Sequence, residues 1–195
     1  MPLEIRLVKY DQKEKEMKNP RRKMQTWIWI ALALSGVATV VICLVMNFAL
    51  IPRIEEGEPP MRCFDMCATG YSPDEARAFV AYLGPNALDV YLHRQLPLDF
   101  VYPVCYTVFF CLLWVVLRGR PDAVLALPLS LMVADYTENA LVLHMLQHPT
   151  FTDAIARAAS VATIAKTVLM YATFGTLAVA AVVVAIRAIR RRSRQ

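Results

Sequence analysis

Four apolar stretches, each long enough to cross a lipid bilayer, constrain this chain more than any other feature. They run over residues 26–51, 96–117, 123–146 and 158–186. A helical crossing needs about 20 residues, and in lipid the backbone has to satisfy its own hydrogen bonds, which favours α-helices. The 195 residues are 57% hydrophobic, with a mean hydropathy of +0.43, which is too apolar for an ordinary soluble domain. The sequence therefore predicts an all-α, polytopic four-helix transmembrane bundle, with one membrane domain over 26–187.

Positive charges cluster on one predicted side of the membrane. Lys and Arg residues gather in the segment 1–25, in the link between the second and third spans, and in the tail 188–195. The segment 52–95 mixes its arginines with acids, and the link 147–152 contains neither Lys nor Arg. Because cytoplasmic loops carry the excess of Lys and Arg, we expect both termini in the cytoplasm of a plasma or endoplasmic reticulum membrane. This topology accounts for the net charge of +5, so the expected partner is the lipid bilayer and not a nucleic acid.

The outer loop 52–95 carries signals for a short helical extracytoplasmic segment. Ser72 and Glu75 have the spacing of a capping box, and Pro73 stands at the first helical position. The helix that they begin is expected to end at Gly84. A second helical piece is expected over 86–95, lying on the outer surface of the bundle.

Cysteine and histidine spacing gives little support for a metal or a cofactor. Cys63 and Cys67 lie in the outer loop, where a disulfide and two free thiols are both open alternatives, and their spacing is not that of a redox-active Cys-x-x-Cys. His144 and His148 are four residues apart, but His148 precedes a proline near the expected helix end. We therefore expect no metal site and no cofactor.

Ionisable residues inside the apolar stretches mark the candidate site. Asp135, Glu138 and Asn139 follow i, i+3, i+4 spacing, which places them on one face of a helix. Lys166 lies in the fourth stretch and Asp99 near the start of the second. Each such group costs at least about 2.5–3.5 kcal/mol in hydrocarbon, so these groups are expected to pair or to face a cavity.

A polar and aromatic stripe on the second span completes the predicted site. Asp99, Tyr102 and Tyr106 share one helical face at i, i+3 and i+7. Counting outward from the middle of each span places Asp135 roughly at the midplane and the other polar groups in the outer half of the bundle. The predicted catalytic residues are Asp135, Glu138 and Lys166, with the lysine as counter-ion of the two acids. The predicted ligand-binding residues are Asp99, Tyr102, Tyr106 and Asn139.

The charges of this cluster point to a binding function. Three carboxylates face a single ammonium, so one acid is expected to be protonated or a cation to be bound. The favoured interpretation is a pocket that binds or acts on a hydrophobic or lipid-like molecule, as an enzyme or as a binding protein. Two alternatives remain. One is an accessory or scaffold protein, with a membrane-protein partner or a second copy of itself, in which the cluster is a structural clasp. The other is a proton- or cation-coupled carrier, which the apolar inner half of the spans disfavours.

Overall fold

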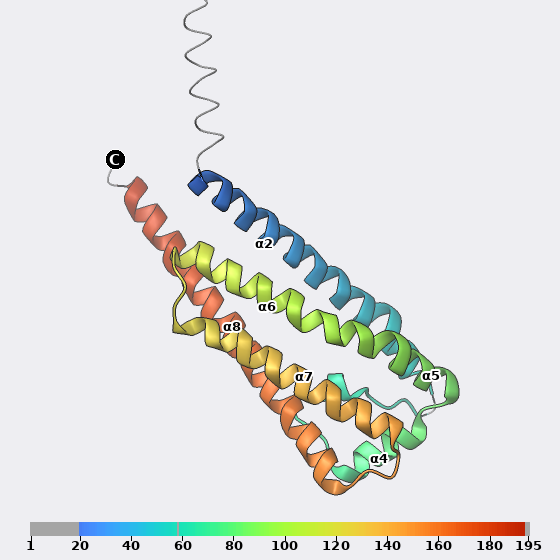
Figure 1. Ribbon diagram of the computed structural model, residues 1–195. Coiled ribbons are helices and arrows are strands. Elements are labelled where there is room, and N and C mark those ends of the chain that lie inside the picture. Colours follow the sequence, from blue (N-terminus) through green and yellow to red (C-terminus); the bar gives the residue numbers. More distant parts are fainter. Residues whose placement is uncertain (1–19, 58, 194–195) are drawn as a thin grey trace, which may run out of the picture.

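The computed structural model describes residues 20–57 and 59–193, and every regular element in these ranges is helical (Figure 1). The predicted all-α class is confirmed for this part of the chain. The predicted tail 1–25 lies mostly outside the described residues, as does the end of the tail 188–195. The main helices are α2 (Pro20–Val45), α3 (Ile51–Ile54), α4 (Pro73–Tyr82), α5 (Pro85–Val90), α6 (Leu96–Arg118), α7 (Ala126–Gln147) and α8 (Asp153–Arg192). Two π turns, η1 (Met46–Leu50) and η3 (Tyr91–Gln95), and two 3₁₀ turns, η2 (Phe64–Met66) and η4 (Ala123–Leu125), connect or extend them.

Three continuous helical segments are long and apolar enough to cross a membrane. They are Met24–Ile54, Pro85–Arg118 and Asp153–Arg192, with mean hydropathies of 2.6, 2.2 and 2.2 in their most apolar stretches. The chain therefore has the make-up of an integral membrane protein. Helix α7 is less apolar because its middle carries acids and an amide, so its crossing, and with it the four-span bundle, stays a prediction.

Each π turn lies just before a proline. Pro52 follows η1 and Pro97 follows η3. A proline ring within a helix clashes with the carbonyl four residues earlier, and here those carbonyls belong to Phe48 and His93, which both lie within the π turns. A π turn is wider than an α turn, so it moves the carbonyl away from the ring. The helices therefore continue through both prolines.

This continuity corrects one expectation from the sequence. The piece predicted over 86–95 is not a separate surface helix. Helix α5, η3 and α6 form one helical segment, Pro85–Arg118, whose first turns extend beyond the predicted start of the second span. The capping box of α4 is confirmed, since Ser72 Oγ accepts from the Glu75 amide at 3.2 Å and the Ser72 amide donates to Glu75 Oε2 at 2.7 Å. These hydrogen bonds lower the pKa of Glu75.

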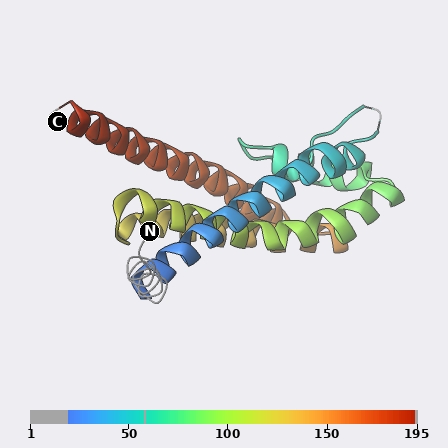
Figure 2. The same cartoon turned by 90° about the horizontal axis from the view of Figure 1, so that it is seen from above.

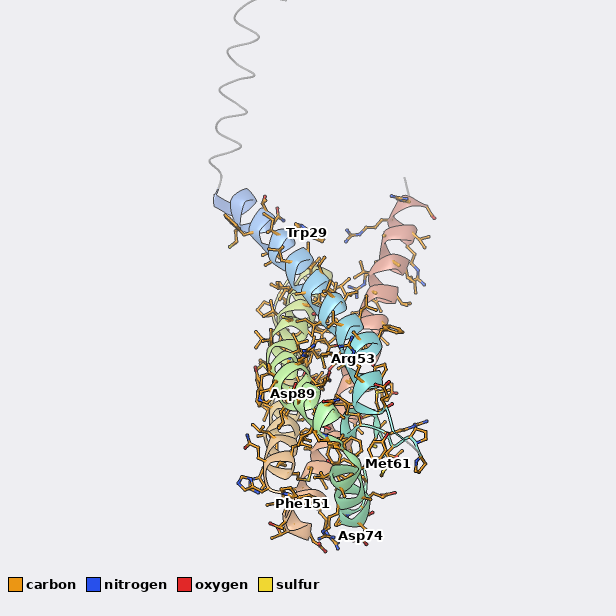
Figure 3. The ribbon with its side chains drawn as sticks, turned by 90° about the vertical axis from the view of Figure 1, so that its right-hand side faces the viewer. Trp29, Arg53, Met61, Asp74, Asp89 and Phe151 are labelled. Atoms are coloured by element: carbon orange, nitrogen blue, oxygen red, sulfur yellow. The ribbon has the colours of Figure 1, made fainter. Side chains whose placement is uncertain are left out.

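Helix α6 lies between α2 on one side and α7 with α8 on the other (Figures 1 and 2). Helix α2 packs along α6, α6 packs on α7, and α7 packs along α8, but α2 and α8 have little contact with each other. At the α2–α6 crossing, Gly36 lets the helices approach, because a Cβ there would lie 2.9 Å from Phe109 Cε2. The start of α2, near Trp29, and the end of α8 lie at the same end of the molecule, opposite Asp74 and Phe151 (Figure 3).

Two buried cores hold the structure together. The first surrounds the short helices and the adjoining ends of α7 and α8, and it includes Phe64, Phe79, Tyr91, Met145 and Phe151. The second lies nearer the opposite end, and it includes Tyr106, Phe110, Trp114, Leu131 and Leu177. Large apolar side chains on the outer faces of α2 and α8 are exposed, as expected for surfaces in contact with lipid. The site lies between the two cores.

The segment between α3 and α4 folds back onto the bundle. Its last turn contacts α8, where the Tyr71 amide donates to Ser160 Oγ at 2.8 Å. Gly70 makes this approach with φ +82°, and a Cβ at this position would lie 2.6 Å from Ser160 Oγ. At its other end the Cys63 amide donates to Glu55 Oε1 at 2.7 Å. These contacts place η2, and with it Asp65, over the space between α6 and α8.

Candidate functional site

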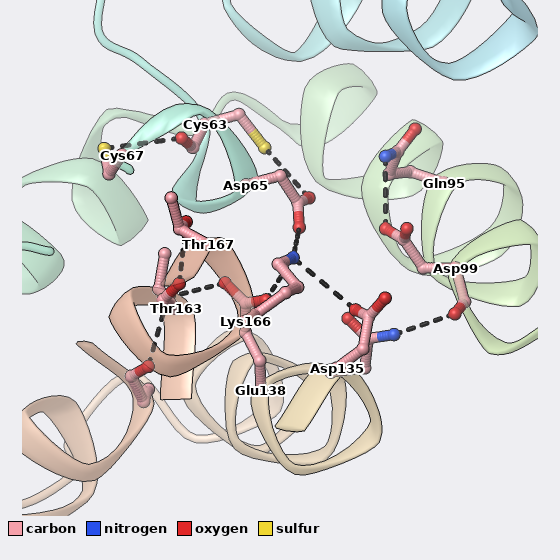
Figure 4. Close-up of polar contacts among 12 residues, drawn as sticks. Cys63, Asp65, Cys67, Gln95, Asp99, Asp135, Glu138, Thr163, Lys166 and Thr167 are labelled. Atoms are coloured by element: carbon pink, nitrogen blue, oxygen red, sulfur yellow. Dashed lines mark hydrogen bonds and ion pairs between the residues drawn. The ribbon is translucent and has the colours of Figure 1, made fainter. Parts of the chain in front are cut away.

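Lys166 of α8 is the centre of the candidate site (Figure 4). Its Nζ contacts Glu138 Oε2, Asp135 Oδ1 at 3.5 Å and Asp65 Oδ1 at 3.2 Å. The lysine side chain is 15% exposed and that of Glu138 is fully buried. One ammonium therefore joins α7, α8 and the segment between α3 and α4.

Hydroxyl groups hold the second oxygens of the two α7 acids. Thr163, one turn before Lys166, donates from Oγ1 to Glu138 Oε1 at 2.5 Å. Tyr106 of α6 donates from its hydroxyl to Asp135 Oδ2 at 2.9 Å. Each acid thus contacts the ammonium with one oxygen and a hydroxyl with the other, an arrangement that holds both carboxylates in place.

A proline in α6 explains the position of Asn139. Pro103 has no N–H, so the carbonyl of Asp99, four residues earlier, loses its helical partner. Asn139 Nδ2 of α7 donates to this carbonyl at 2.8 Å. The Asp99 side chain is held separately, because Gln95 Nε2 donates to its Oδ2 at 3.1 Å. The polar residues of α6 and α7 therefore form a connected buried network.

An open pocket of about 300 Å³ lies beside this network. Its polar lining includes Asp65, Asp99, Asp135 and Lys166, and its apolar and aromatic lining includes Met46, Ile51, Tyr102, Met170 and Tyr171. The lining residues come from η1 and α3, from the segment containing η2, and from α6, α7 and α8. Because α2 and α8 have little contact, the pocket is not closed by packing between these two helices.

The seven residues that the sequence analysis selected fall into three groups. Asp135, Glu138 and Lys166 are in mutual contact through the ammonium. Asp99 and Tyr102 line the pocket. Tyr106 and Asn139 are buried behind it, where they contact Asp135 and Asp99. Their catalytic and binding roles stay predictions.

Sequence reasoning missed two residues of the site. Asp65 has no periodicity to mark it, because it lies in an irregular segment 101 residues away from its partner Lys166. Gln95 did carry a signal, since it precedes Asp99 by four residues on one helix. With Asp65 included, three carboxylates contact the ammonium and a fourth, that of Asp99, lines the same pocket, so the excess of acid is larger than the three carboxylates predicted.

Cys63 borders this network, whereas the two histidines at the end of α7 lie apart from it. Cys63 and Cys67 are free thiols, and Cys63 Sγ lies 3.8 Å from Asp65 Oδ2. Burial, and secondarily the charge of Asp65, raises the pKa of Cys63. His144 and His148 stack with ring centroids 4.6 Å apart at the end of α7. Within the described ranges no group of three or more His, Cys, Asp or Glu side chains has the arrangement of a metal site.

These features define a helical membrane protein with a buried acid–lysine cluster beside a pocket. No known protein family, curated protein or solved structure matches the chain.

Proposed function

We propose that this multi-pass membrane protein binds or acts on a hydrophobic or lipid-like molecule in the pocket beside Lys166. The observation that carries the proposal is the pocket itself, whose lining combines apolar side chains with three acids and one ammonium. Ligand sites are typically apolar cavities with a few convergent polar groups that set orientation. Intramembrane ionisable residues are functional candidates because a simple packing role can be met by less costly groups.

The apolar and the polar lining residues would bind different parts of the ligand. An apolar tail would contact Met46, Met170 and Tyr171, while a polar head would meet Asp99 and Asp135. Asp135 and Glu138 are the proposed central acids, with Lys166 as their counter-ion.

The remaining site residues have supporting parts in this proposal. Tyr102 would contact the ligand from the same helix as Asp99, α6. Tyr106 and Asn139 are proposed to position Asp135 and Asp99 from behind the pocket, because both are buried and hydrogen-bonded there.

The proposed orientation places the pocket toward the outer leaflet. The start of α2 and the end of α8 share one end of the molecule (Figure 3), as the charge pattern requires if both tails are cytoplasmic. The pocket lies toward the other end, under the short helices of 52–95.

The test is to purify the intact protein in mild detergent and to identify co-purifying lipids and small molecules by mass spectrometry. The variant Asp135→Asn/Glu138→Gln removes two negative charges from the cluster. A matched control, Glu56→Gln/Asp74→Asn, removes two charges from exposed positions outside the pocket. We expect a discrete molecule with the wild type and the control, and its loss from the pocket variant. An empty wild-type pocket would contradict the proposal.

A structural clasp is the second candidate, and a specific observation favours it. Lys166 joins three separate elements, so its ion pairs could hold these elements together without any role in ligand binding. A clasp predicts that the pocket variant loses folded protein or a co-purifying partner protein, with no small molecule bound to the wild type. A proton- or cation-coupled carrier is less well supported, because the core around Phe110, Leu131 and Leu177 is apolar.

A further inference from the structure

Asp99 is a buried acid on the pocket wall that has no cationic partner among the described residues. It is 3% exposed. Its Oδ2 accepts a hydrogen bond from Gln95, but no described residue donates to Oδ1 or brings a Lys or Arg within ion-pair distance. A buried carboxylate without a partner is unfavourable, since the charge has lost its hydration.

Lys166, the lysine of the site, is not an ion-pair partner of Asp99. Lys166 Nζ already contacts the carboxylates of Asp65, Asp135 and Glu138. An ammonium has three N–H donors, and three acids already surround this one, with a hydrogen bond to Asp65 Oδ1. The pocket therefore has room for a further positive charge on the side of Asp99, and an anionic head would face an excess of acid.

We propose that the ligand is an amphiphile with a protonated amine head, whose ammonium pairs with Asp99 in the pocket. This inference rests on the proposed function and names the ligand class for that site. The amine donates to Asp99 Oδ1, and the aromatic ring of Tyr102, three residues later on α6, provides a face for the cation. The negative charge that Lys166 leaves unbalanced attracts the head group and selects against anions of the same length.

The shape of the site fits a charged head with an apolar tail. A volume of about 300 Å³ holds a small head group and the first part of a chain. Asn47 of η1 and Tyr171 of α8 both line the pocket and are exposed, and Tyr171 is 71% exposed. The tail therefore leaves the pocket between η1 and α8, where the two helical segments have little contact with each other. The outer face of α8 beside this opening is apolar.

The test compares two probes of equal chain length, dodecylamine and dodecan-1-ol, which differ in the charge of the head. Binding to the full chain in nanodiscs is measured by equilibrium dialysis at pH 7, with empty nanodiscs subtracted. We expect saturable binding of the amine at least tenfold tighter than that of the alcohol. Asp99→Asn should reduce amine binding at least tenfold, while Asp74→Asn, at an exposed acid on α4, should leave it unchanged. Equal binding of the two probes, or full amine binding by Asp99→Asn, would overturn the proposal.

A second measurement needs no variant. A hydrophobic carbodiimide reacts with carboxyl groups inside membranes, and peptide mass spectrometry locates the labelled residue. Dodecylamine should protect Asp99 from labelling, and dodecan-1-ol should not. Equal labelling of Asp99 with and without the amine would reject the amine site even if Asp99→Asn failed to fold.

The outcomes separate this inference from the function on which it rests. A co-purifying molecule lost from Asp135→Asn/Glu138→Gln, combined with no preference for the amine probe, rejects the amine and leaves the pocket function standing. Absence of any co-purifying molecule and of any saturable probe binding rejects both.

Discussion

Replacing Lys166 by Met removes the one cation of the buried cluster and keeps an unbranched side chain of similar length. Glu138 Oε2 then loses its ion partner, and Asp135 Oδ1 loses the same ammonium, while both acids stay buried. Breaking a buried ion pair by removing one partner costs about 3–5 kcal/mol, because the charge left behind is uncompensated. We expect Lys166→Met to lower the free energy of unfolding by about that amount, or the melting temperature by roughly 10 °C for a chain of this size.

The assay is reversible unfolding in detergent, followed by circular dichroism. The matched control is Arg157→Met on the same helix, because Arg157 is exposed and lies 4.0 Å from its acid; an exposed pair contributes at most about 1 kcal/mol. Adding Glu138→Gln to Lys166→Met should restore part of the loss, since the amide keeps the Thr163 contact without the charge. Equal stability of Lys166→Met and Arg157→Met would refute the conclusion that Lys166 compensates the negative charge of the buried acids.

Three smaller perturbations test other parts of the structure. Asn139→Leu should destabilise by about 1–3 kcal/mol in the same unfolding assay, because the Asp99 carbonyl loses its donor; unchanged stability would reject that explanation of Asn139. Gly70→Ala should cost about 1–2 kcal/mol, since its φ is +82°, whereas Gly84→Ala, with open space around it and an ordinary φ, should cost less; equal losses would contradict this. Burial raises the pKa of Cys63, so little thiolate forms at pH 8, and maleimide labelling of this residue, read by mass spectrometry, should require unfolding; rapid labelling of the folded protein would show otherwise.

Local patterns predicted those features of the fold that depend on neighbouring residues. The capping box at Ser72 and the shared face of Asp135, Glu138 and Asn139 follow from helical spacing alone. The opposite charges of Lys166 and of Asp135 and Glu138 also allowed their pairing to be predicted from the sequence.

Features that depend on distant contacts were beyond such reasoning. Asp65 reaches Lys166 only because Gly70 and the Ser160 hydroxyl hold the connecting segment against α8, and Tyr71 and Ser160 are 89 residues apart. The join between α5 and α6 was missed for a different reason. Pro97 is compatible with an unbroken helix once a π turn precedes it, and apolar periodicity does not reveal such a turn.

The π turn before Pro52 determines which face of α2 packs on α6. A π turn holds one more residue than an α turn, and each residue of an α-helix turns the chain by about 100°. Deleting one residue between Met46 and Leu50 would restore an α-helical register and rotate the preceding helix by about that angle relative to α3. Gly36 would then turn away from Phe109, and a bulkier face of α2 would meet α6. The extra residue in η1 thus sets the rotational phase at which the first helix meets its neighbour.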